Sequence, residues 1–328
     1  MATLLLTRSE IQKLLTLEEC ITAVEQAFRM QAAGQTLPPG ILGVPALDGG
    51  FHIKAAGLKL GRTYFAMKCN GNFFRNRERF AMPNIQGIIL LCDGENGSPL
   101  ALMDSIEITI QRTGAATAVA AKHLARRDAR VATICGCGNQ GRVQLRALAR
   151  ILKLEKVLAY DADSGAAQRF AEELSRELGM EIEAVREPGP AVRQSQVCVT
   201  CTPSRQHFLG REDVAPGTFV AAVGADSEDK QELHPALLAG SKVVVDILEQ
   251  CATIGELHHA LKQGVMSRED VYAELSEVVS GAKPGRTSED EITIFDSTGT
   301  ALQDAAAAAI VYEKAVTEGR AQQVEFGQ

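Results

Sequence analysis

A glycine-rich segment in the middle of the chain has the residue types and spacing that bind a dinucleotide phosphate. Residues 131–141 are VATICGCGNQG, an apolar run followed by a GxGxxG pattern, and the helix-like sequence RVQLRALARIL comes next. In a Rossmann fold this turn joins a strand to a helix, and N–H groups at the helix N-terminus face the pyrophosphate. The pattern predicts a dinucleotide site, with a purely structural turn as the alternative; its residues are Gly136, Gly138, Asn139, Gln140 and Gly141.

The next apolar run supports a dinucleotide site and indicates which dinucleotide it takes. The sequence KVLAYD ends in Asp161, twenty residues past Gly141, where a carboxylate can accept hydrogen bonds from the adenosine ribose. Asp163 follows at once, with no arginine nearby in the sequence. Because a 2′-phosphate would meet like charge there, we expect NAD(H) rather than NADP(H).

Two cations stand in apolar segments of the N-terminal third. Lys68 lies in the strand-like TYFAMKCN, where an ammonium needs an anionic partner or a reason to be uncharged, unless it reaches water at a sheet edge. Arg112 is the only cation between residues 105 and 121, among small residues that let a ligand come close. Its guanidinium can hold a carboxylate with two hydrogen bonds, or it can form a structural ion pair with Glu107 or Asp104.

Two polar segments follow strand-like runs in the C-terminal half. Asp226 comes directly after TFVAAVG, at the end of a parallel strand where ligands of such sheets bind, and it can transfer protons there. A turn or N-cap aspartate is the alternative, and Lys230 is close enough in sequence to pair with it or to touch a cofactor. In residues 296–299, DSTG, the N–H groups and hydroxyls of Ser297, Thr298 and Gly299 can bind an anion or a carboxamide, or can cap a helix.

Composition excludes several other classes of protein. A modest net charge of −7 argues against nucleic acid or an anionic membrane as partner, and no apolar stretch is long enough to cross a bilayer. Eight cysteines without a secretory signal favour reduced thiols in the cytoplasm. Cys198 and Cys201 match CxxC, but we expect both in one strand, on opposite faces. With only the adjacent His258 and His259 as a further pair, we expect no metal site.

The order of predicted elements divides the 328 residues into two parts. Capping boxes at Thr7 and Thr16 predict two helices, the second running to about Ala33 before GQTLPPG breaks it. Strand-like runs from about 41 to 102 predict an antiparallel sheet, followed by a long helix over 105–126. From residue 131 strands and helices alternate, which is typical of a doubly wound parallel sheet. The last strand, EITIFDS, leads into the alanine-rich helix ALQDAAAAAIVYEKAV.

Six motifs together resemble the ornithine cyclodeaminase/mu-crystallin family. They occur in the family's order along nearly the whole chain, and the C-terminal two-thirds is especially similar to the family's archaeal alanine dehydrogenases. The motifs are RTGAAT at 112–117, GCGNQG at 136–141, CTPS at 201–204, GADSEDKQEL at 224–233, VVVDILEQ at 243–250 and FDSTGTALQD at 295–304.

The resemblance implies an α/β fold in which a Rossmann domain, here 116–304, is inserted into an α+β substrate and dimerisation domain with an antiparallel sheet. The second domain comprises 1–115 and 305–328, and two copies form a homodimer. The resemblance assigns the catalytic lysine to Lys68, the carboxylate-binding arginine to Arg112 and the acid/base aspartate to Asp226. It also adds Thr202 and Pro203 of CTPS to the cofactor site, with Lys230 and residues 297–299.

The chemistry implied is NAD-dependent oxidation of an L-α-amino acid to its imino acid. Lys68 and Arg112 anchor the α-carboxylate, and Asp226 accepts a proton from the α-ammonium. Alternatives are a reductase of cyclic ketimines such as pyrroline-2-carboxylate and, outside enzymes, a mu-crystallin-like binding protein. The early arginine of many members is missing here, and His52 and Lys54 occupy its neighbourhood, so we expect them to contact the substrate and ornithine need not be that substrate.

Overall fold

The computed structural model describes residues 2–319 and 321–326, which form two compact units. Unit 1 contains the described residues of Met1–Arg112 and Thr300–Gln328, and unit 2 contains Thr113–Gly299. The first boundary falls inside helix α4 (Ser105–Leu124), and the second falls just before helix α12 (Ala301–Glu318). The sequence-based domain boundaries were 115/116 and 304/305.

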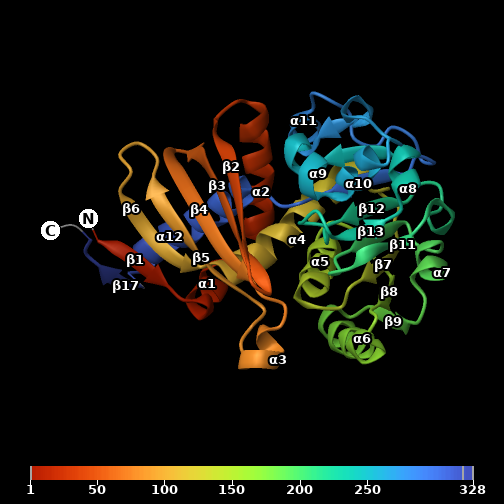
Figure 1. Cartoon of the computed structure of the whole chain (residues 1–328), viewed down its shortest axis with the longest axis horizontal. Helices are drawn as coiled ribbons and strands as arrows, with labels where there is room; N and C mark the ends of the chain where they lie inside the picture. The colour runs from red at the N-terminus through yellow and green to blue at the C-terminus, as the bar shows by residue number, and fades with distance from the viewer. Residues whose placement is uncertain (1, 320, 327–328) are drawn as a thin grey trace. The chain divides into compact units, whose positions relative to one another are not determined.

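Unit 1 is built on a seven-stranded sheet with the order β17-β1-β6-β5-β4-β3-β2 (Figure 1). Neighbouring strands are antiparallel, as predicted, except for β1 and β6, which are parallel. Sequence analysis missed β1 and β17 because each is only a few residues long. The strands are β1 (Thr3–Leu6), β2 (Thr36–Ala46), β3 (Gly49–Leu60), β4 (Arg62–Asn72), β5 (Ile85–Asp93), β6 (Pro99–Asp104) and β17 (Gln322–Val324).

Helices of unit 1 pack on this sheet, with α12 in contact with β3, β4 and α2 (Figure 1). The capping boxes are confirmed: Glu10 Oε2 accepts from Thr7 N at 2.8 Å, and Glu19 Oε2 accepts from Thr16 N at 3.1 Å. Besides α4 and α12 the helices are α1 (Arg8–Leu14), α2 (Leu17–Ala32) and the short α3 (Asn76–Phe80), which was not predicted.

The segment after α2 differs from its prediction. We expected LPPG to be a break, but β2 already begins at Thr36 and includes both prolines. Proline lacks the N–H donor of a regular ladder, and it is tolerated in edge strands and at irregularities. Here β2 is the edge of the sheet, and its register with β3 shifts between Leu37 and Gly40.

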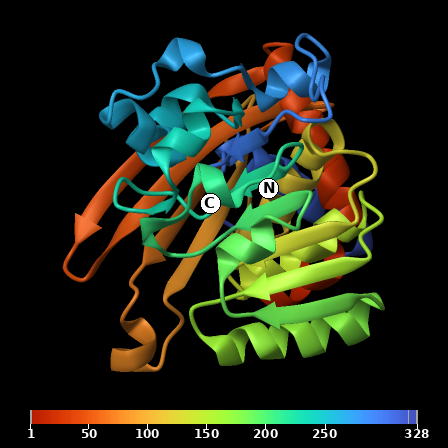
Figure 2. The same ribbon diagram turned by 90° about the vertical axis from the view of Figure 1, so that its right-hand side faces the viewer.

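Unit 2 contains the predicted doubly wound parallel sheet, in the order β15-β14-β16-β12-β10-β7-β8-β9. The chain runs from β7 outward to β9, then returns to the other side of β7 with β10, so the order reverses between β7 and β10. Figure 2 shows the β7–β9 region with α6 alongside. Ligands of such sheets bind beyond the strand ends at the point of reversal. The strands are β7 (Val131–Cys135), β8 (Lys156–Tyr160), β9 (Glu181–Val185), β10 (Val197–Thr200), β12 (Phe219–Ala222), β14 (Lys242–Val245), β15 (Ala273–Glu274) and β16 (Thr293–Asp296).

The connections of unit 2 carry its helices and one separate strand pair. Strand β11 (Arg205–Leu209) is parallel to β13 (Gln231–Leu233), and together they form a small second sheet that was not predicted. The helices are α5 (Asn139–Ala149), α6 (Ser164–Leu178), α7 (Pro188–Val192), α8 (Pro235–Ala239), α9 (Leu248–Ile254), α10 (Glu256–Lys262) and α11 (Leu275–Ser280), with 3-10 turns at Arg211–Asp213 and Arg268–Asp270.

None of the helices in the described part of the chain combines the length and hydropathy needed to cross a bilayer.

Candidate active site

A buried cluster of opposite charges lies inside unit 1. Lys68 on β4 places Nζ 2.8 Å from Oδ2 of Asp304, and Nε of Arg112 on α4 lies 3.0 Å from Oδ1 of the same carboxylate. The exposed fractions of the three residues are 4%, 6% and 0%. Burying a charge is costly unless it is paired, and here one carboxylate pairs with two cations.

Sequence analysis missed Asp304, and it gave Arg112 the wrong structural partners. Glu107 instead accepts hydrogen bonds from Gln12 and Gln111, while Arg112 Nη1 donates to Oε1 of Gln303 at 3.0 Å. One signal for Asp304 was available, because it is the only charged residue from Ala301 to Tyr312. A lone acid in an alanine-rich helix calls for a cation on the facing element.

The electrostatics of this cluster alter the protonation of its members. Burial, together with the nearby positive charges of Arg112 and Lys54, lowers the pKa of Lys68 to about 7 against the attraction of Asp304. For Asp304, burial favours the neutral acid, but Lys68 and Arg112 prevail and hold its pKa below the ordinary value. The cluster therefore holds a carboxylate that stays charged beside a lysine that titrates near neutral pH.

The other two predicted substrate residues lie on β3, next to this cluster. Lys54 is directly opposite Lys68 in the antiparallel pair β3–β4, so both side chains leave the same face of the sheet. His52, two residues earlier, shares that face and lies opposite Asn70. Lys54 is buried and His52 is half-buried. Unit 1 therefore brings all four predicted substrate residues, Lys68, Arg112, Lys54 and His52, to one region.

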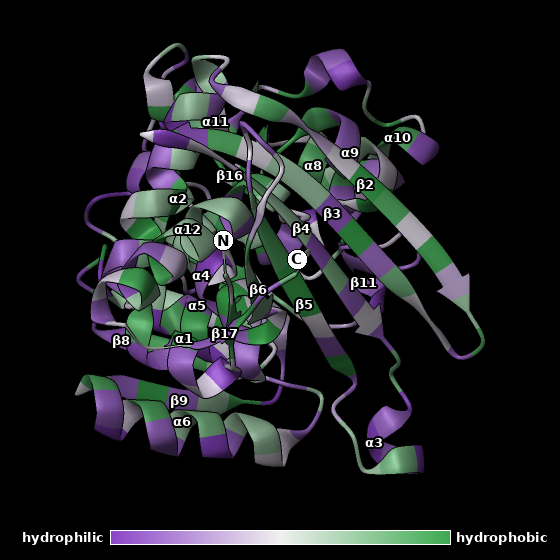
Figure 3. Ribbon diagram, turned by 90° about the vertical axis from the view of Figure 1, so that its left-hand side faces the viewer, coloured by the Kyte–Doolittle hydropathy of each residue, from purple (hydrophilic) through white to green (hydrophobic). Residues whose placement is uncertain are grey.

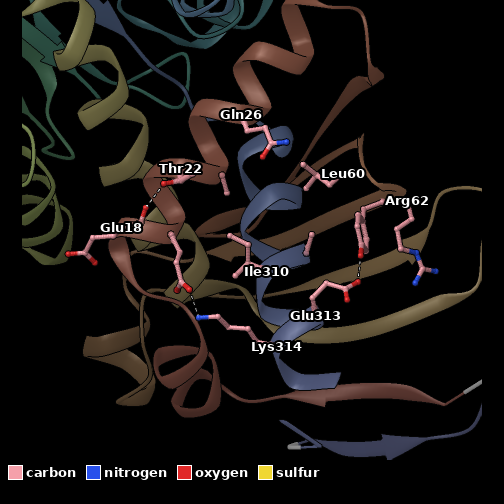
Figure 4. A pocket seen from close by; sticks show the side chains of 12 residues that line it. Glu18, Thr22, Gln26, Leu60, Arg62, Ile310, Glu313 and Lys314 are labelled. Atoms are coloured by element: carbon pink, nitrogen blue, oxygen red, sulfur yellow. Dashed lines mark hydrogen bonds and ion pairs between the residues drawn. The ribbon is translucent and has the colours of Figure 1, made fainter. Parts of the chain in front are cut away.

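A separate cavity of about 750 Å³ in unit 1 lies between α2, α12 and the β3–β4 hairpin (Figure 4). Several of its polar groups are bound to one another: Lys314 Nζ lies 2.6 Å from Glu19 Oε1, and Tyr64 Oη donates to Glu313. None of the predicted substrate residues is in its lining, so we do not place the substrate there. The lining residues are Glu18, Glu19, Thr22, Ala23, Gln26, Leu60, Arg62, Tyr64, Ala309, Ile310, Glu313 and Lys314.

In unit 2 the glycine-rich turn has the geometry that a dinucleotide phosphate requires. Gly136 has φ of 107°, and a Cβ there would lie 2.9 Å from the carbonyl oxygen of Cys201. A Cβ on Gly141 would lie 2.0 Å from the Gly136 oxygen, whereas one on Gly138 would meet nothing within 4 Å. The open side of the turn at Gly138 coincides with the N-cap of α5, where N–H groups face an incoming anion. Asn139 and Gln140 form the first turn of this helix.

Asp161 lies against the same turn. Its Oδ2 accepts the Cys137 N–H at 2.8 Å, and its Oδ1 accepts the Asp163 N–H at 3.0 Å. The expectation that no arginine is near these carboxylates is wrong for Asp163, because the first two turns of α6 bring Arg169 to 3.4 Å from it. The side chains of Asp163 and Arg169 are both mostly exposed. The two hydrogen bonds that Asp161 accepts come from backbone N–H groups.

Asp226 and Lys230 pair with each other in the loop after β12. Lys230 Nζ lies 2.5 Å from Asp226 Oδ1, and the Asp226 side chain is 42% exposed. The Lys230 carbonyl is itself bonded to Nε2 of His259 at 2.8 Å. Pairing was one of the two roles predicted for Lys230, and Asp226 stands beyond the carboxyl end of a parallel strand as expected.

The expectation of free donors at 297–299 is wrong. Ser297 Oγ and Gly299 N both donate to Asp246 Oδ2, at 2.9 and 2.6 Å, and Thr298 Oγ1 accepts from Gln250 Nε2 at 2.6 Å. The reason is the strand order: Asp246 directly follows β14, the neighbour of β16, so its carboxylate reaches the segment that follows β16. Asp246 and Gln250 are buried and hold this segment in place.

Thr202 and Pro203 follow β10 at the point of sheet reversal. Both Thr202 N and Thr202 Oγ1 donate to Glu232 Oε1, at 2.6 and 2.7 Å. Cys201 lies one residue beyond the strand rather than within it, and its Sγ contacts the Gly136 oxygen at 3.3 Å. The loops after β7 and β10 are therefore in direct contact.

The two residue pairs that suggested metal chemistry lie in different settings. His258 and His259 of α10 have ring centroids 5.2 Å apart in edge-to-face contact, and Cys198 is buried within β10. Within residues 2–319 and 321–326, no group of three or more His, Cys, Asp or Glu side chains is arranged to hold a metal ion.

A parallel sheet with a GxGxxG turn, joined in one chain to a unit with a buried Lys–Asp–Arg cluster, defines a two-domain dinucleotide-binding protein of the oxidoreductase class. The family model for the ornithine cyclodeaminase/mu-crystallin family matches residues 1–319. The chain belongs to this family, as the motifs predicted.

Individual relatives match over nearly their whole length. Alanine dehydrogenase of Archaeoglobus fulgidus is 39% identical over 99% of both chains. The solved structure of an archaeal alanine dehydrogenase dimer with bound NAD has a TM-score of 0.95 at 39% identity, with full coverage of both chains. Thermococcus litoralis Δ1-pyrroline-2-carboxylate reductase with NADH and L-proline has a TM-score of 0.93 at 36% identity, over 98% of this chain and 100% of that one.

Proposed function

We propose that the chain is an NAD-dependent enzyme that oxidises an L-α-amino acid to its imino acid by hydride transfer. The buried cluster of Lys68, Arg112 and Asp304 is the observation that carries the proposal. Two cations fixed on one carboxylate form a rigid, positively charged receptor, which suits a small substrate that carries a carboxylate. The alanine dehydrogenase relative, 39% identical over 99% of both chains, supports the same class of reaction.

In this proposal Lys68 and Arg112 bind the α-carboxylate, and Asp304 positions both. Lysine has three N–H donors and arginine five, so the bonds to Asp304 and Gln303 leave both cations with further donors. Fixing the carboxylate orients the α-carbon, which is how such contacts lower the barrier for transfer of its hydrogen. Lys54 and His52, on the same face of β3, contact the remainder of the substrate.

Asp226 serves as the acid/base group. A neutral amine pushes hydride off the α-carbon whereas an ammonium does not, so a base must first take the ammonium proton. Asp226 is partly exposed and its carboxylate pairs with Lys230, and we assign the proton transfer to this carboxylate. Lys230 holds the carboxylate in orientation while it acts.

The glycine-rich turn, the N-terminus of α5 and Asp161 would hold NAD. The close contacts of Gly136 and Gly141, and the open space at Gly138, are what a bound pyrophosphate requires. Bound NAD⁺ supplies the acceptor for the hydride. Asp161 disfavours a 2′-phosphate, and three similar solved structures contain bound NAD, NADH or NAD⁺. Thr202, Pro203 and the 297–299 segment complete this site in our proposal.

A second candidate is the reverse type of reaction, reduction of a cyclic ketimine. The Thermococcus litoralis reductase supports it, because that 36% identical protein was solved with NADH and L-proline. The same carboxylate receptor and the same acid/base group serve either direction, since both reactions transfer a hydride between the nicotinamide and the carbon that bears the carboxylate and the nitrogen. The substrate's side chain then decides between them. A mu-crystallin-like binder without turnover is the alternative of another class.

One screen separates these functions. The purified protein is mixed with NAD⁺ and each L-α-amino acid, and separately with NADH and pyrroline-2-carboxylate or its six-membered homologue, with NADP(H) as comparison. Formation of NADH from an acyclic amino acid supports the leading proposal, and faster reduction of cyclic imines supports the second. Tight NADH binding without turnover of any candidate would identify a binding protein.

We further propose that the protein is a cytoplasmic homodimer. Large apolar side chains are exposed along β2 and β5, among them Ile41, Leu42 and Ile88 at 48%, 55% and 47%. Figure 3 shows hydrophobic stretches along both strands. Exposed apolar patches of this kind mark association surfaces, and one similar structure is described as a dimer. All eight cysteines are free thiols, which agrees with a reducing compartment. Sedimentation of wild type and Leu42→Asp tests the dimer, with a monomer expected for the variant.

A further inference from the structure

Three buried carboxylates at the carboxyl ends of the strands in unit 2 are linked through backbone hydrogen bonds, because each of the first two binds the segment that carries the next. Each accepts backbone N–H groups: Asp296 from Glu256 and Leu257, Glu256 from Glu232 and Leu233, and Glu232 from Thr202 and Gly224. None of the three is more than 1% exposed.

Glu232 differs from the other two because its two carboxylate oxygens bind two different loops. Oε1 accepts from Thr202 N and Oγ1, in the loop after β10, at 2.6 and 2.7 Å. Oε2 accepts from Gly224 N, in the loop after β12, at 3.1 Å. The first loop contains the proposed cofactor residues Thr202 and Pro203, and the second leads directly to Asp226.

The fit around this carboxylate is tight. A Cβ on Gly224 would lie 2.4 Å from Glu232 Oε2 and 2.6 Å from the Thr202 oxygen. Gly224 is therefore a position where a side chain would displace the carboxylate. Cys201, next to Thr202, also contacts the Gly136 oxygen, so the same support extends to the glycine-rich turn.

We propose that Glu232 is the positioning residue that holds the loops after β10 and β12 in the arrangement that binds the dinucleotide. The inference rests on the proposed function, because it assumes that these loops contact NAD(H). Holding both loops requires two acceptor oxygens on one side chain, which a carboxylate has. An amide has one oxygen and one NH₂ group, so a glutamine would point a donor at the N–H of either Thr202 or Gly224.

Glu256 offers a matched control. It is an equally buried glutamate, and it also accepts two backbone N–H groups, but these belong to β13 itself and not to the cofactor loops. Glu232→Gln and Glu256→Gln thus carry the same chemical change in the same region. Gly224→Ala is a second route to the same effect, because it displaces the carboxylate without removing a buried charge.

The experiment combines amide hydrogen exchange of the unliganded protein with NADH titration by fluorescence. In Glu232→Gln we expect faster exchange at Thr202 and Gly224 and an NADH Kd raised about tenfold or more. In Glu256→Gln we expect faster exchange at Glu232 and Leu233 and less than about a twofold change in Kd. Gly224→Ala should resemble Glu232→Gln in both measurements.

The outcomes separate this inference from the proposed function. Wild-type protein that does not bind NADH would overturn the proposed function, whatever the exchange data are. Wild-type binding with an unchanged Kd in both Glu232→Gln and Gly224→Ala would overturn the positioning role alone. Equal losses of affinity in Glu232→Gln and Glu256→Gln, without faster exchange at Thr202 and Gly224 in either variant, would also overturn it, because the effect would then not act through the two loops.

Discussion

Lys54 and Lys68 lie directly opposite each other on β3 and β4, and both are more than nine-tenths buried. Like charges at facing positions of a sheet repel and destabilise it. A nearby carboxylate reduces the repulsion, and Asp304, 2.8 Å from Lys68 Nζ, supplies one. This pair of lysines is therefore a feature that favours an anionic ligand at the expense of stability.

Replacing Lys54 should separate binding from stability. In Lys54→Met we expect the unfolding free energy to stay the same or rise by up to about 1 kcal/mol, because the repulsion is removed. The KM for the amino acid should rise about tenfold through loss of one cation. Chemical denaturation and steady-state kinetics measure the two effects. Lys59→Met, at an exposed position of the same strand, should change neither, and equal behaviour of the two variants would contradict the role of Lys54.

Removing the shared anion should have the opposite effect on stability. Asp304→Asn leaves Lys68 and Arg112 buried without the carboxylate that pairs with both. Breaking such a buried pair costs about 3 kcal/mol or more, and we expect that loss in urea denaturation. Glu313→Gln, on the same helix but at the open cavity, should cost less than about 1 kcal/mol. Similar losses of unfolding free energy in both variants would contradict a special contribution of the Lys68–Asp304–Arg112 cluster to stability.

The lowered pKa of Lys68 gives a pH dependence with a definite sign. Its pKa falls from 10.5 to about 7 on folding, so between these values the unfolded chain binds more protons than the native one. The contribution of Lys68 to the free energy of unfolding therefore increases as pH rises from about 7 toward 10.5. Below pH 7 the ammonium is protonated in both states, and the destabilisation caused by burying it is fully present. Denaturation midpoints across this range should rise less in Lys68→Met than in wild type. Parallel curves for the two proteins would contradict the assignment.

Asp226→Asn should affect chemistry and not cofactor binding. The amide cannot accept the substrate's proton, so we expect kcat to fall by roughly 10²-fold or more, while the Kd for NADH changes little. Lys230→Met is the companion variant, because it removes the partner of Asp226 and leaves the carboxylate; a smaller loss is expected. Full activity of Asp226→Asn would remove this residue from the mechanism.

Much of the fold and part of the site could be predicted from local patterns. Apolar alternation placed Lys68 in a strand and left open whether its ammonium is buried or reaches water at a sheet edge, and the strand–turn–helix pattern located the glycine-rich turn. Each of these signals lies within one segment of sequence, where spacing alone determines which side chains share a face.

What sequence analysis missed depends on contacts between distant segments. Asp304 is separated by nearly two hundred residues from Arg112, with which it pairs, so no spacing rule joins them. The donors at Ser297 and Gly299 were expected to bind an anion or a carboxamide, or to cap a helix, because they lie where a strand gives way to a helix; Asp246 binds them from beyond the neighbouring strand. Glu232 was missed for the same reason, since its partners lie in two other loops.

The most direct test of the proposed reaction follows the hydrogen on the α-carbon. The protein is incubated with NAD⁺ and the amino acid that it turns over best, deuterated at the α-carbon, and the NADH formed is analysed by mass spectrometry and NMR. Hydride transfer predicts one deuterium at C4 of the nicotinamide and a slower rate than with the undeuterated substrate. NADH without deuterium, or loss of the label to water, would contradict the central claim.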